Sequence, residues 1–152
     1  MTRAHLILTA TLGPASLLAG AFAFQAFGYA ACHLCLLQRW PHAVAILIGV
    51  LALTVRWRPL AWLGAAAALN TAGLGLYHTG VERHWWEGPT TCTSGSIAGV
   101  DPKELLNQIL AAPIVRCDEV AWQMLGLSMA SWNMLASLVL VGIWVAAARR
   151  AA

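Results

Sequence analysis

Charged residues are rare along the chain and leave four long stretches without a formal charge. The stretches contain 35, 16, 23 and 29 residues and lie between Arg3 and Arg39, Arg39 and Arg56, Arg58 and Glu82, and Glu119 and Arg149. A helix that crosses a membrane needs about 20 apolar residues, with a range of roughly 17–25. The pattern therefore predicts an all-α integral membrane protein, a bundle of four transmembrane helices over residues 6–28, 41–55, 60–79 and 124–147.

The first two stretches each require an interpretation. The first is longer than the roughly 7–15 apolar residues of a signal peptide core, so we expect a retained helix, with cleavage near Ala21 or Ala23 as the alternative. The second is short for a span, and we expect it to fit by local thinning of the bilayer or by use of flanking residues. Pro41 and Pro59 are expected in the first turns of the second and third helices, where a proline loses no helical hydrogen bond.

The composition agrees with a membrane protein of one domain spanning residues 1–152. The chain is 60% hydrophobic and 10% charged, with a mean hydropathy of +0.70, whereas a soluble domain carries about 25% charged residues. A soluble globule of this size cannot bury so much apolar surface. The same composition excludes a disordered chain, a collagen-like chain and a nucleic-acid-binding arm, and the net charge of +3 is modest.

Arginines in the short segments set the expected orientation. They lie near the N-terminus, between the second and third spans, and in the C-terminal tail: Arg3, Arg56, Arg58, Arg149 and Arg150. With four spans these segments share one side, and the positive-inside rule makes that side cytoplasmic. We therefore expect both termini in the cytoplasm, with loops 29–40 and 80–123 on the opposite side. Loop 80–123, between the third and fourth spans, is long and contains all six acidic residues.

The four cysteines all fall in the two loops on that opposite side. Cys32 and Cys35 form a Cys-x-x-Cys in the first loop, and Cys92 and Cys117 lie in the second. Outside the cytosol, paired thiols tend to oxidise to disulfides. A Cys-x-x-Cys disulfide closes a ring too short to stabilise the chain much, and such pairs more often carry out thiol exchange. Arg39, one helical turn after Cys35, favours a thiolate there.

Other readings of these residues compete with redox chemistry. Covalent haem attachment requires a histidine after the second cysteine, where Leu36 stands, and a thioredoxin-like domain requires strands that the pattern does not predict. A zinc site with four thiolates and a pair of inert structural disulfides remain as alternatives. Asn70 and Asn133 are expected to form hydrogen bonds between helices as packing contacts rather than to bind a ligand.

These residues together resemble a known family. The run Cys32-His33-Leu34-Cys35-Leu36-Leu37-Gln38-Arg39 after the first span resembles the DsbB family of disulfide bond formation proteins. A second cysteine pair between spans three and four, and Tyr77-His78 at the end of span three, extend the resemblance over essentially the whole chain.

The resemblance implies an enzyme, a thiol:quinone oxidoreductase of the bacterial cytoplasmic (inner) membrane with its cysteines on the periplasmic side. Such a protein oxidises the dithiol of a soluble, periplasmic DsbA-like thiol oxidase and passes the electrons to ubiquinone or menaquinone. Its expected partners are therefore that oxidase, membrane lipid and quinone, with no metal and no nucleic acid. Two alternatives are a membrane scaffold or assembly protein with structural loop disulfides, and a metal-handling membrane protein.

The resemblance also implies a role for each site residue. Cys92 receives the attack of the partner's thiolate, and the released Cys117 attacks Cys32. Cys35 then leaves as a thiolate that faces the quinone, with Arg39 stabilising both. His78 is expected beside the quinone. The other histidines near these positions are His42 and His84.

Overall fold

Among the residues that the structure describes, the regular elements are helices except for one short hairpin. The computed structural model describes residues 2–55, 57–89, 92, 101, 103, 106–107, 110 and 115–150. Within them lie four long helices, α1 (Arg3–Ala26), α2 (His33–Val55), α3 (Pro59–Glu82) and α5 (Met129–Arg149), and two strands, β1 (Gln123–Met124) and β2 (Leu127–Ser128). All four helices are long and apolar enough to cross a membrane, which confirms the predicted number of spans.

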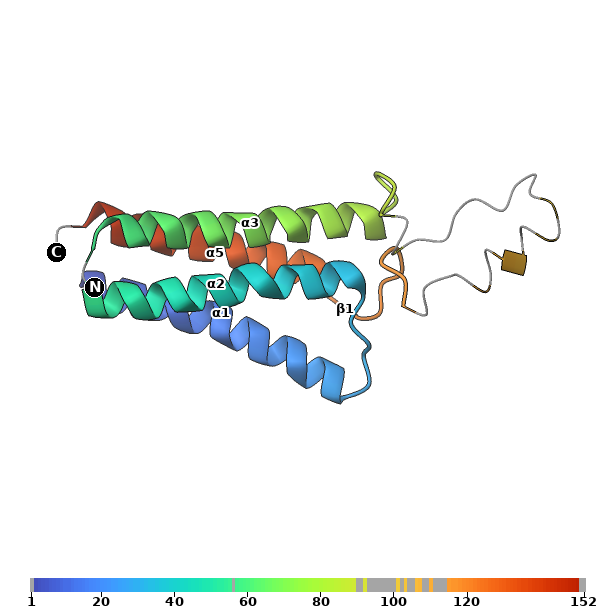
Figure 1. Cartoon of the computed structure of the whole chain (residues 1–152), viewed down its shortest axis with the longest axis horizontal. Helices are drawn as coiled ribbons and strands as arrows, with labels where there is room; N and C mark the ends of the chain where they lie inside the picture. The colour runs from blue at the N-terminus through green and yellow to red at the C-terminus, as the bar shows by residue number, and fades with distance from the viewer. Residues whose placement is uncertain are drawn as a thin grey trace.

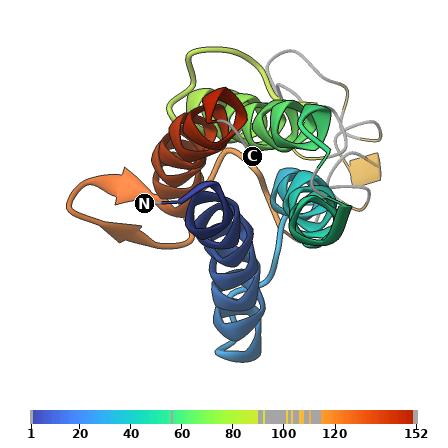
Figure 2. The same ribbon diagram turned by 90° about the vertical axis from the view of Figure 1, so that its left-hand side faces the viewer.

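The four helices form an antiparallel bundle with both termini at one end (Figure 1). The opposite end carries the connection between α1 and α2 and the segments that contain the second cysteine pair; we call it the cysteine end. Viewed along the bundle, α3 and α5 pack closely, whereas α1 leans away from the other helices as it approaches the cysteine end (Figures 1 and 2). Pro14 lies inside α1 and removes one of its hydrogen bonds.

Small residues allow the helices to approach one another. A Cβ atom at Gly64 of α3 would lie 2.6 Å from the indole of Trp144 on α5, which is fully buried. At the other half of the same interface, a Cβ atom at Gly75 would lie 3.1 Å from the Ala130 carbonyl oxygen. Without a hydrophobic driving force between helices in lipid, such close packing is a main source of their association.

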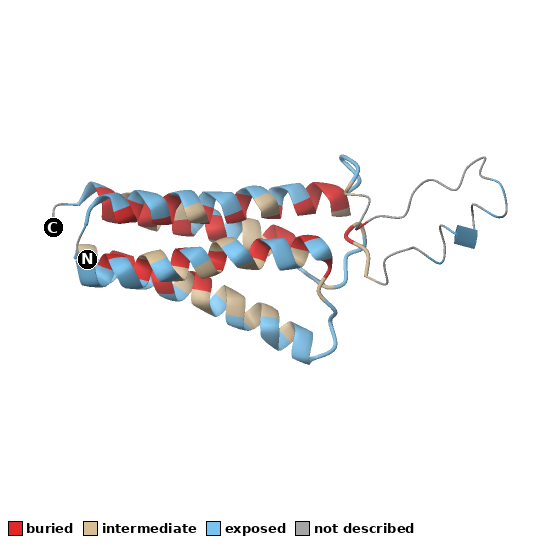
Figure 3. Ribbon diagram, in the orientation of Figure 1, coloured by how far each residue is buried: buried red, intermediate tan, exposed pale blue. Residues whose placement is uncertain are grey.

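The outer surface of the bundle is apolar. Buried side chains follow the helix faces that meet, while exposed side chains on the spans include many leucines and valines (Figure 3). In the apolar windows of the four helices only 28–44% of residues are buried within the protein. A soluble protein rarely exposes apolar surface on this scale, so lipid is the solvent that this surface fits.

Replacing Gly64 with alanine should destabilise the bundle, because the added methyl group meets the Trp144 indole. We expect a loss of about 1–3 kcal/mol in the free energy of unfolding, the usual range for overpacking. Gly73, on the same helix, has no atom within 4 Å of an added Cβ and provides the matched control. Denaturation in mixed micelles measures both variants, and equal stability of Gly64→Ala and Gly73→Ala would contradict this packing.

The second helix differs from its predicted bounds. It begins at His33 rather than at residue 41, and Pro41 lies inside it rather than in its first turn. The predicted loop 29–40 is correspondingly shorter. A proline inside a membrane helix is tolerated where neighbouring groups compensate for the missing hydrogen bond. The resulting helix has 23 residues, so of the two expected solutions the use of flanking residues is the one observed, and local thinning of the bilayer is unnecessary.

The fourth span begins later than predicted, at Met129 rather than at residue 124. The preceding residues form a hairpin in which Gln123 pairs with Ser128 and Met124 with Leu127. Its two turn residues, Leu125 and Gly126, have φ angles of 53° and 76°, values that a two-residue hairpin turn requires and a helix excludes. The predicted start of the fourth span was therefore wrong, whereas the predicted all-α fold class is unaffected by this short hairpin.

The other boundaries shift by a few residues. The first helix ends at Ala26 rather than at residue 28, because Gly28 has a φ of 95° and leaves the helical path. The third helix continues to Glu82 rather than ending at residue 79, so the following loop begins later than residue 80. Much of the predicted loop 80–123 lies outside the described residues.

Candidate functional site

The first cysteine pair is organised by the start of α2. Cys32 directly precedes the helix, and its Sγ accepts a hydrogen bond from the backbone N–H of Cys35 at 3.2 Å. Cys32 thus takes the place of a helix cap, and the i, i+3 spacing turns the two side chains toward each other. The two Sγ atoms lie 2.9 Å apart, and both cysteines are free thiols.

Cys35 lies within the first turn of the spanning helix, so the prediction that no cysteine lies in a span was wrong. The reason is the earlier start of α2 at His33. This position favours thiol chemistry at Cys35, because the unpaired N–H groups of a helix N-terminus favour negative charge on a nearby sulfur atom.

The hydrogen bond that Cys32 donates to Cys35, together with burial, raises the pKa of the Cys32 thiol far above its usual value. The reduced pair therefore keeps a proton on Cys32. Cys32 is almost completely buried, whereas Cys35 is partly accessible.

The second cysteine pair forms a disulfide, Cys92–Cys117. Both residues are fully buried and pack in one cluster with Cys32, Leu34 and Val81. The two pairs thus meet at the cysteine end, although they come from opposite halves of the sequence. The four-thiolate zinc site does not form in this structure, because two of its sulfur atoms are bonded to each other.

His78, near the end of α3, lies between the two cysteine pairs. Its Nε2 is 3.6 Å from the Cys32 Sγ, and the backbone of Cys117 lies close to the same ring. The other ring nitrogen, Nδ1, is 2.8 Å from the Gln38 amide nitrogen. His84 is exposed beyond the end of α3. Of the histidines considered from the sequence, His78 is therefore the one beside the thiols.

The ligand atoms of Cys32, Cys35 and His78 all lie within 4.8 Å of one another. A structural zinc site takes four ligands. Within the part of the chain that the structure describes, no fourth histidine, cysteine or carboxylate joins this group. The three side chains therefore fall short of a structural zinc site and form a thiol pair with a neighbouring histidine.

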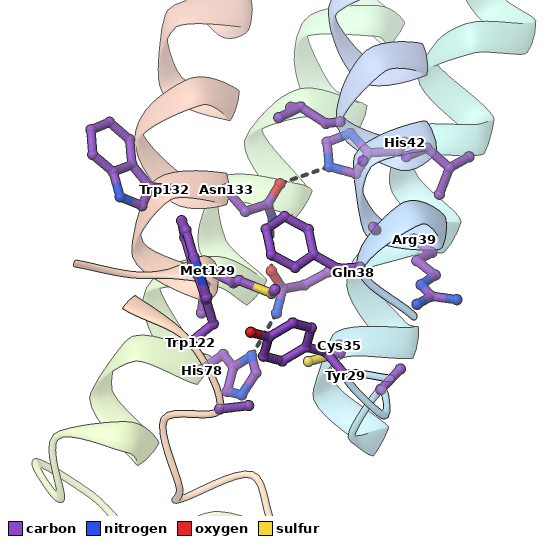
Figure 4. Close-up of a pocket in the computed structure, with 18 of the residues that line it drawn as sticks. Tyr29, Cys35, Gln38, Arg39, His42, His78, Trp122, Met129, Trp132 and Asn133 are labelled. Carbon is purple, nitrogen blue, oxygen red and sulfur yellow. Dashed lines mark hydrogen bonds between the residues drawn. The ribbon is translucent and has the colours of Figure 1, made fainter. Parts of the chain in front are cut away.

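A cavity of about 360 Å³ adjoins the thiol pair, between α1, α2 and α5 (Figure 4). It occupies the space that opens where α1 leans away from the bundle. Most of its lining is apolar, and its polar and reactive side chains include Cys35, Arg39, His78, Gln38, His42 and Asn133. Cavities of this size and lining are typical of sites for small organic molecules.

Arg39 lines this cavity and contacts an aromatic ring on α1. Its guanidinium carbon lies 4.7 Å from the centre of the Phe22 ring. Its Nε atom is buried and has no hydrogen-bond partner among the described residues. A buried donor without an acceptor is costly, so an oxygen atom of a bound molecule would stabilise this arrangement.

Sequence reasoning missed the polar side chains that extend from His78 into the bundle. Asn133 of α5 donates to Gln38 at 2.6 Å, and His42 lies 2.8 Å from the Asn133 amide oxygen (Figure 4). Gln38 and His42 lie four residues apart on the buried face of α2. Two polar residues on the buried face of a membrane helix are a signal of function that was available from the sequence.

Asn133 forms the expected contact between helices, whereas the Asn70 side chain is exposed on α3. The prediction of a packing hydrogen bond is thus confirmed for Asn133 only in part, because its partners belong to the site. The Asn70 side chain forms no hydrogen bond with another described residue, so the predicted packing role is not supported for Asn70.

Comparison with known proteins places the chain in a family. It is 29% identical over 119 residues to an uncharacterised protein of Rickettsia prowazekii (strain Madrid E), covering 76% of this chain and 69% of that protein. No solved structure was found to match. The model of the family "Disulfide bond formation protein DsbB" matches residues 3–147, nearly the whole chain. With four helices able to span a membrane and a thiol pair beside a buried disulfide, the chain is a multi-pass membrane protein that belongs to the DsbB family.

Proposed function

We propose that the protein is a thiol:quinone oxidoreductase that sustains protein disulfide bond formation. It takes electrons from the dithiol of a soluble, DsbA-like periplasmic oxidase and passes them to ubiquinone or menaquinone in the membrane. The observation that carries the proposal is the position of Cys32 and Cys35, between a buried disulfide on one side and an apolar cavity on the other. Family membership supports the disulfide-forming role.

The first exchange takes place at the Cys92–Cys117 disulfide. A thiolate of the partner attacks the Cys92 sulfur, so a mixed disulfide forms, the Cys92–Cys117 bond breaks, and Cys117 leaves as a thiolate. Cys92 is fully buried in the present arrangement. Docking of the partner must therefore expose this sulfur before the attack, because disulfide exchange requires access along the S–S bond.

The second exchange moves the electrons to the first pair. The Cys117 thiolate attacks Cys32 of an oxidised Cys32–Cys35 pair, a Cys32–Cys117 bond forms, and Cys35 leaves as a thiolate. Contact between Cys117 and Cys32 in one buried cluster supports this route. The partner's second thiol releases Cys92, Cys92 restores its bond to Cys117, and Cys32 and Cys35 remain as the reduced pair that the structure contains.

The residues around the cavity fit a quinone. A bound quinone supplies an acceptor for two electrons and two protons, which equals what the pair releases when it forms a disulfide. Cys35 borders the cavity, and the apolar lining suits a lipid-soluble ring. The Arg39 Nε, which has no partner among the described residues, offers a donor to a carbonyl oxygen. His78 lies on the same wall, beside Cys32.

The proposed chemistry also implies an orientation of the protein in the membrane. The cysteine end would face the periplasm of the bacterial inner membrane, where the thiol partner is found, and both termini would lie in the cytoplasm. The arginine-rich segments at the end of the bundle that holds the termini agree with this orientation.

Replacing Arg39 with alanine should raise the KM for quinone by at least about tenfold, the scale expected for loss of a charged hydrogen bond. Arg149, an exposed arginine in the last turn of α5, is the matched control. The measurement is quinone reduction by the purified protein at several quinone concentrations, with the unfolding midpoint of each variant recorded alongside. An unchanged KM in Arg39→Ala would remove this arginine from the quinone site.

A membrane scaffold with structural disulfides is the alternative that one observation favours. The Cys92–Cys117 disulfide is completely buried, as a purely structural bond often is. A scaffold should keep its activity in cells when all four cysteines are replaced by serine and lose only thermal stability. The oxidoreductase should lose its activity in the same variant, so one complementation experiment separates the two functions.

A further inference from the structure

A row of hydrogen bonds runs from His42, in the middle of the bundle, to His78 (Figure 4) and continues from His78 to the thiol pair. Its links join His42 Nε2 to Asn133 Oδ1 at 2.8 Å, Asn133 Nδ2 to Gln38 Oε1 at 2.6 Å, and Gln38 Nε2 to His78 Nδ1 at 2.8 Å. Two further links join His78 Nε2 to Cys32 Sγ at 3.6 Å and Cys32 Sγ to Cys35 Sγ at 2.9 Å. The row thus connects side chains of α2, α3 and α5 to the sulfur atom of Cys32.

The direction of the row follows from its amide groups. The Gln38 Nε2 atom also lies 3.4 Å from the Leu34 carbonyl oxygen, an acceptor, so Nε2 is the donor at this end of the amide. Gln38 therefore donates to His78 Nδ1, and a neutral His78 must carry its proton on Nε2, facing Cys32. At the other end Asn133 donates to Gln38, so its Oδ1 accepts from His42.

We propose that these side chains form a directional donor chain that ends on the sulfur of Cys35. Each member accepts a hydrogen bond from the preceding residue and donates one to the next. Gln38, Asn133 and His42 are then positioning residues, which fix His78 as the Nε2–H tautomer without touching a sulfur atom. Aligned hydrogen bonds polarise one another, most strongly in a medium of low dielectric constant. The chain would therefore stabilise negative charge on Cys35, the sulfur proposed above to face the quinone.

Other charged groups act on the same sulfur atom. Arg39 of α2 lines the same cavity as Cys35, and Glu82 of α3 lies on the other side of His78. A cation favours negative charge on a nearby sulfur atom, whereas a carboxylate opposes it. Glu82 is largely buried, and its Oε1 lies 3.9 Å from His78 Nε2. On the α1 and α5 sides, the described residues that line the cavity include no charged side chain. The donor chain thus adds to the effect of Arg39 and offsets that of Glu82.

Substitutions at Asn133 separate a directional role from mere packing. Asn133→Asp keeps a hydrogen-bonding group of the same shape, but a carboxylate cannot donate a hydrogen bond to Gln38. The Gln38 amide must then turn its oxygen toward His78 Nδ1, so the ring carries its proton on Nδ1 and the Nε2–H of His78 is lost. Asn133→Leu removes both links. Thr71→Val is the matched control, because Thr71 is fully buried in α3 and, among the described residues, its hydroxyl bonds only to Ala67 of its own helix.

Two measurements test the donor chain, both on the reduced, purified protein without quinone or partner. They are the rate of Cys35 alkylation by iodoacetamide at one neutral pH, and the reduction potential of the Cys32–Cys35 pair against a glutathione buffer. Loss of one net hydrogen bond predicts alkylation about fivefold slower in both Asn133 variants. The same factor in the equilibrium constant corresponds to a potential roughly 20 mV more negative.

Thr71→Val should match the wild type in both measurements. Wild-type rate and potential in folded Asn133→Asp would overturn the donor chain. If the Asn133 variants do not fold, His42 provides the test, because His42→Gln retains an amide donor and should keep the wild-type rate, whereas His42→Leu should slow it. Equal rates in these two variants would also overturn the chain. Neither result depends on electron transfer to quinone. A result that disproves the donor chain can therefore be distinguished from one that disproves the proposed function.

Discussion

Replacing Cys117 with alanine should make the protein accumulate a mixed disulfide with its thiol partner. Cys92, now without its bonded neighbour, attacks the disulfide of the oxidised partner, so a Cys92–partner bond forms and one partner thiol is released. The sulfur that would carry the reaction on to Cys32 is missing. We expect the adduct to dominate on non-reducing gels, and turnover to fall by at least about a thousandfold, as when a nucleophile is removed from an enzyme.

A double variant, Cys92→Ala with Cys117→Ala, provides the control for this adduct. It has neither loop thiol, so it should form no covalent complex while keeping Cys32 and Cys35. If Cys117→Ala gives no adduct with any periplasmic thiol protein, or if the double variant gives the same adduct, then Cys92 is not the sulfur that meets the partner.

Replacing Cys35 with serine should abolish quinone reduction. A hydroxyl group keeps its proton at neutral pH, so no negative charge develops beside the cavity, and no disulfide with Cys32 can form. The purified protein with added quinone should also lose the visible charge-transfer absorption that a thiolate next to a quinone produces. Quinone reduction, followed by absorbance, should fall to the background rate.

Cys32→Ser distinguishes the roles of the two thiols. It should lose turnover but keep the visible absorption, because Cys35 still borders the cavity. His33→Ala, an exposed change within the same four-residue run, should behave like the wild type. A visible absorption that persists in Cys35→Ser would show that another group faces the quinone.

The number of helices was predictable because charges are costly in a bilayer and therefore mark the limits of each span. Their ends were less predictable. Pro41 suggested a helix start, but α2 begins at His33, since a charged residue such as Arg39 is tolerated where it lines a cavity near the end of a span. The hairpin before α5 was hidden in an apolar run, and the structure reveals it by the pairing of its two strands and the positive φ angles of Leu125 and Gly126.

The candidate site residues were predicted from the spacing of cysteines and from family resemblance, whereas their arrangement was not. No local pattern relates Cys117 to Cys32 or His78, because packing of separate helices and loops brings them together. Asn133 looked like a packing residue for the same reason: its significance depends on Gln38, 95 positions away in the sequence. Contacts of this kind are set by tertiary structure, which a single sequence does not encode as a local signal.

The most direct test of the proposed electron relay is the stoichiometry of electron transfer. The purified protein is mixed with a reduced DsbA-like oxidase and excess ubiquinone, and quinone consumption and partner thiols are followed in the same sample. The proposed relay predicts one quinone reduced for each partner disulfide formed, in catalytic excess over the protein. Oxidation of the partner without loss of quinone, or no oxidation at all by a folded protein, would contradict it.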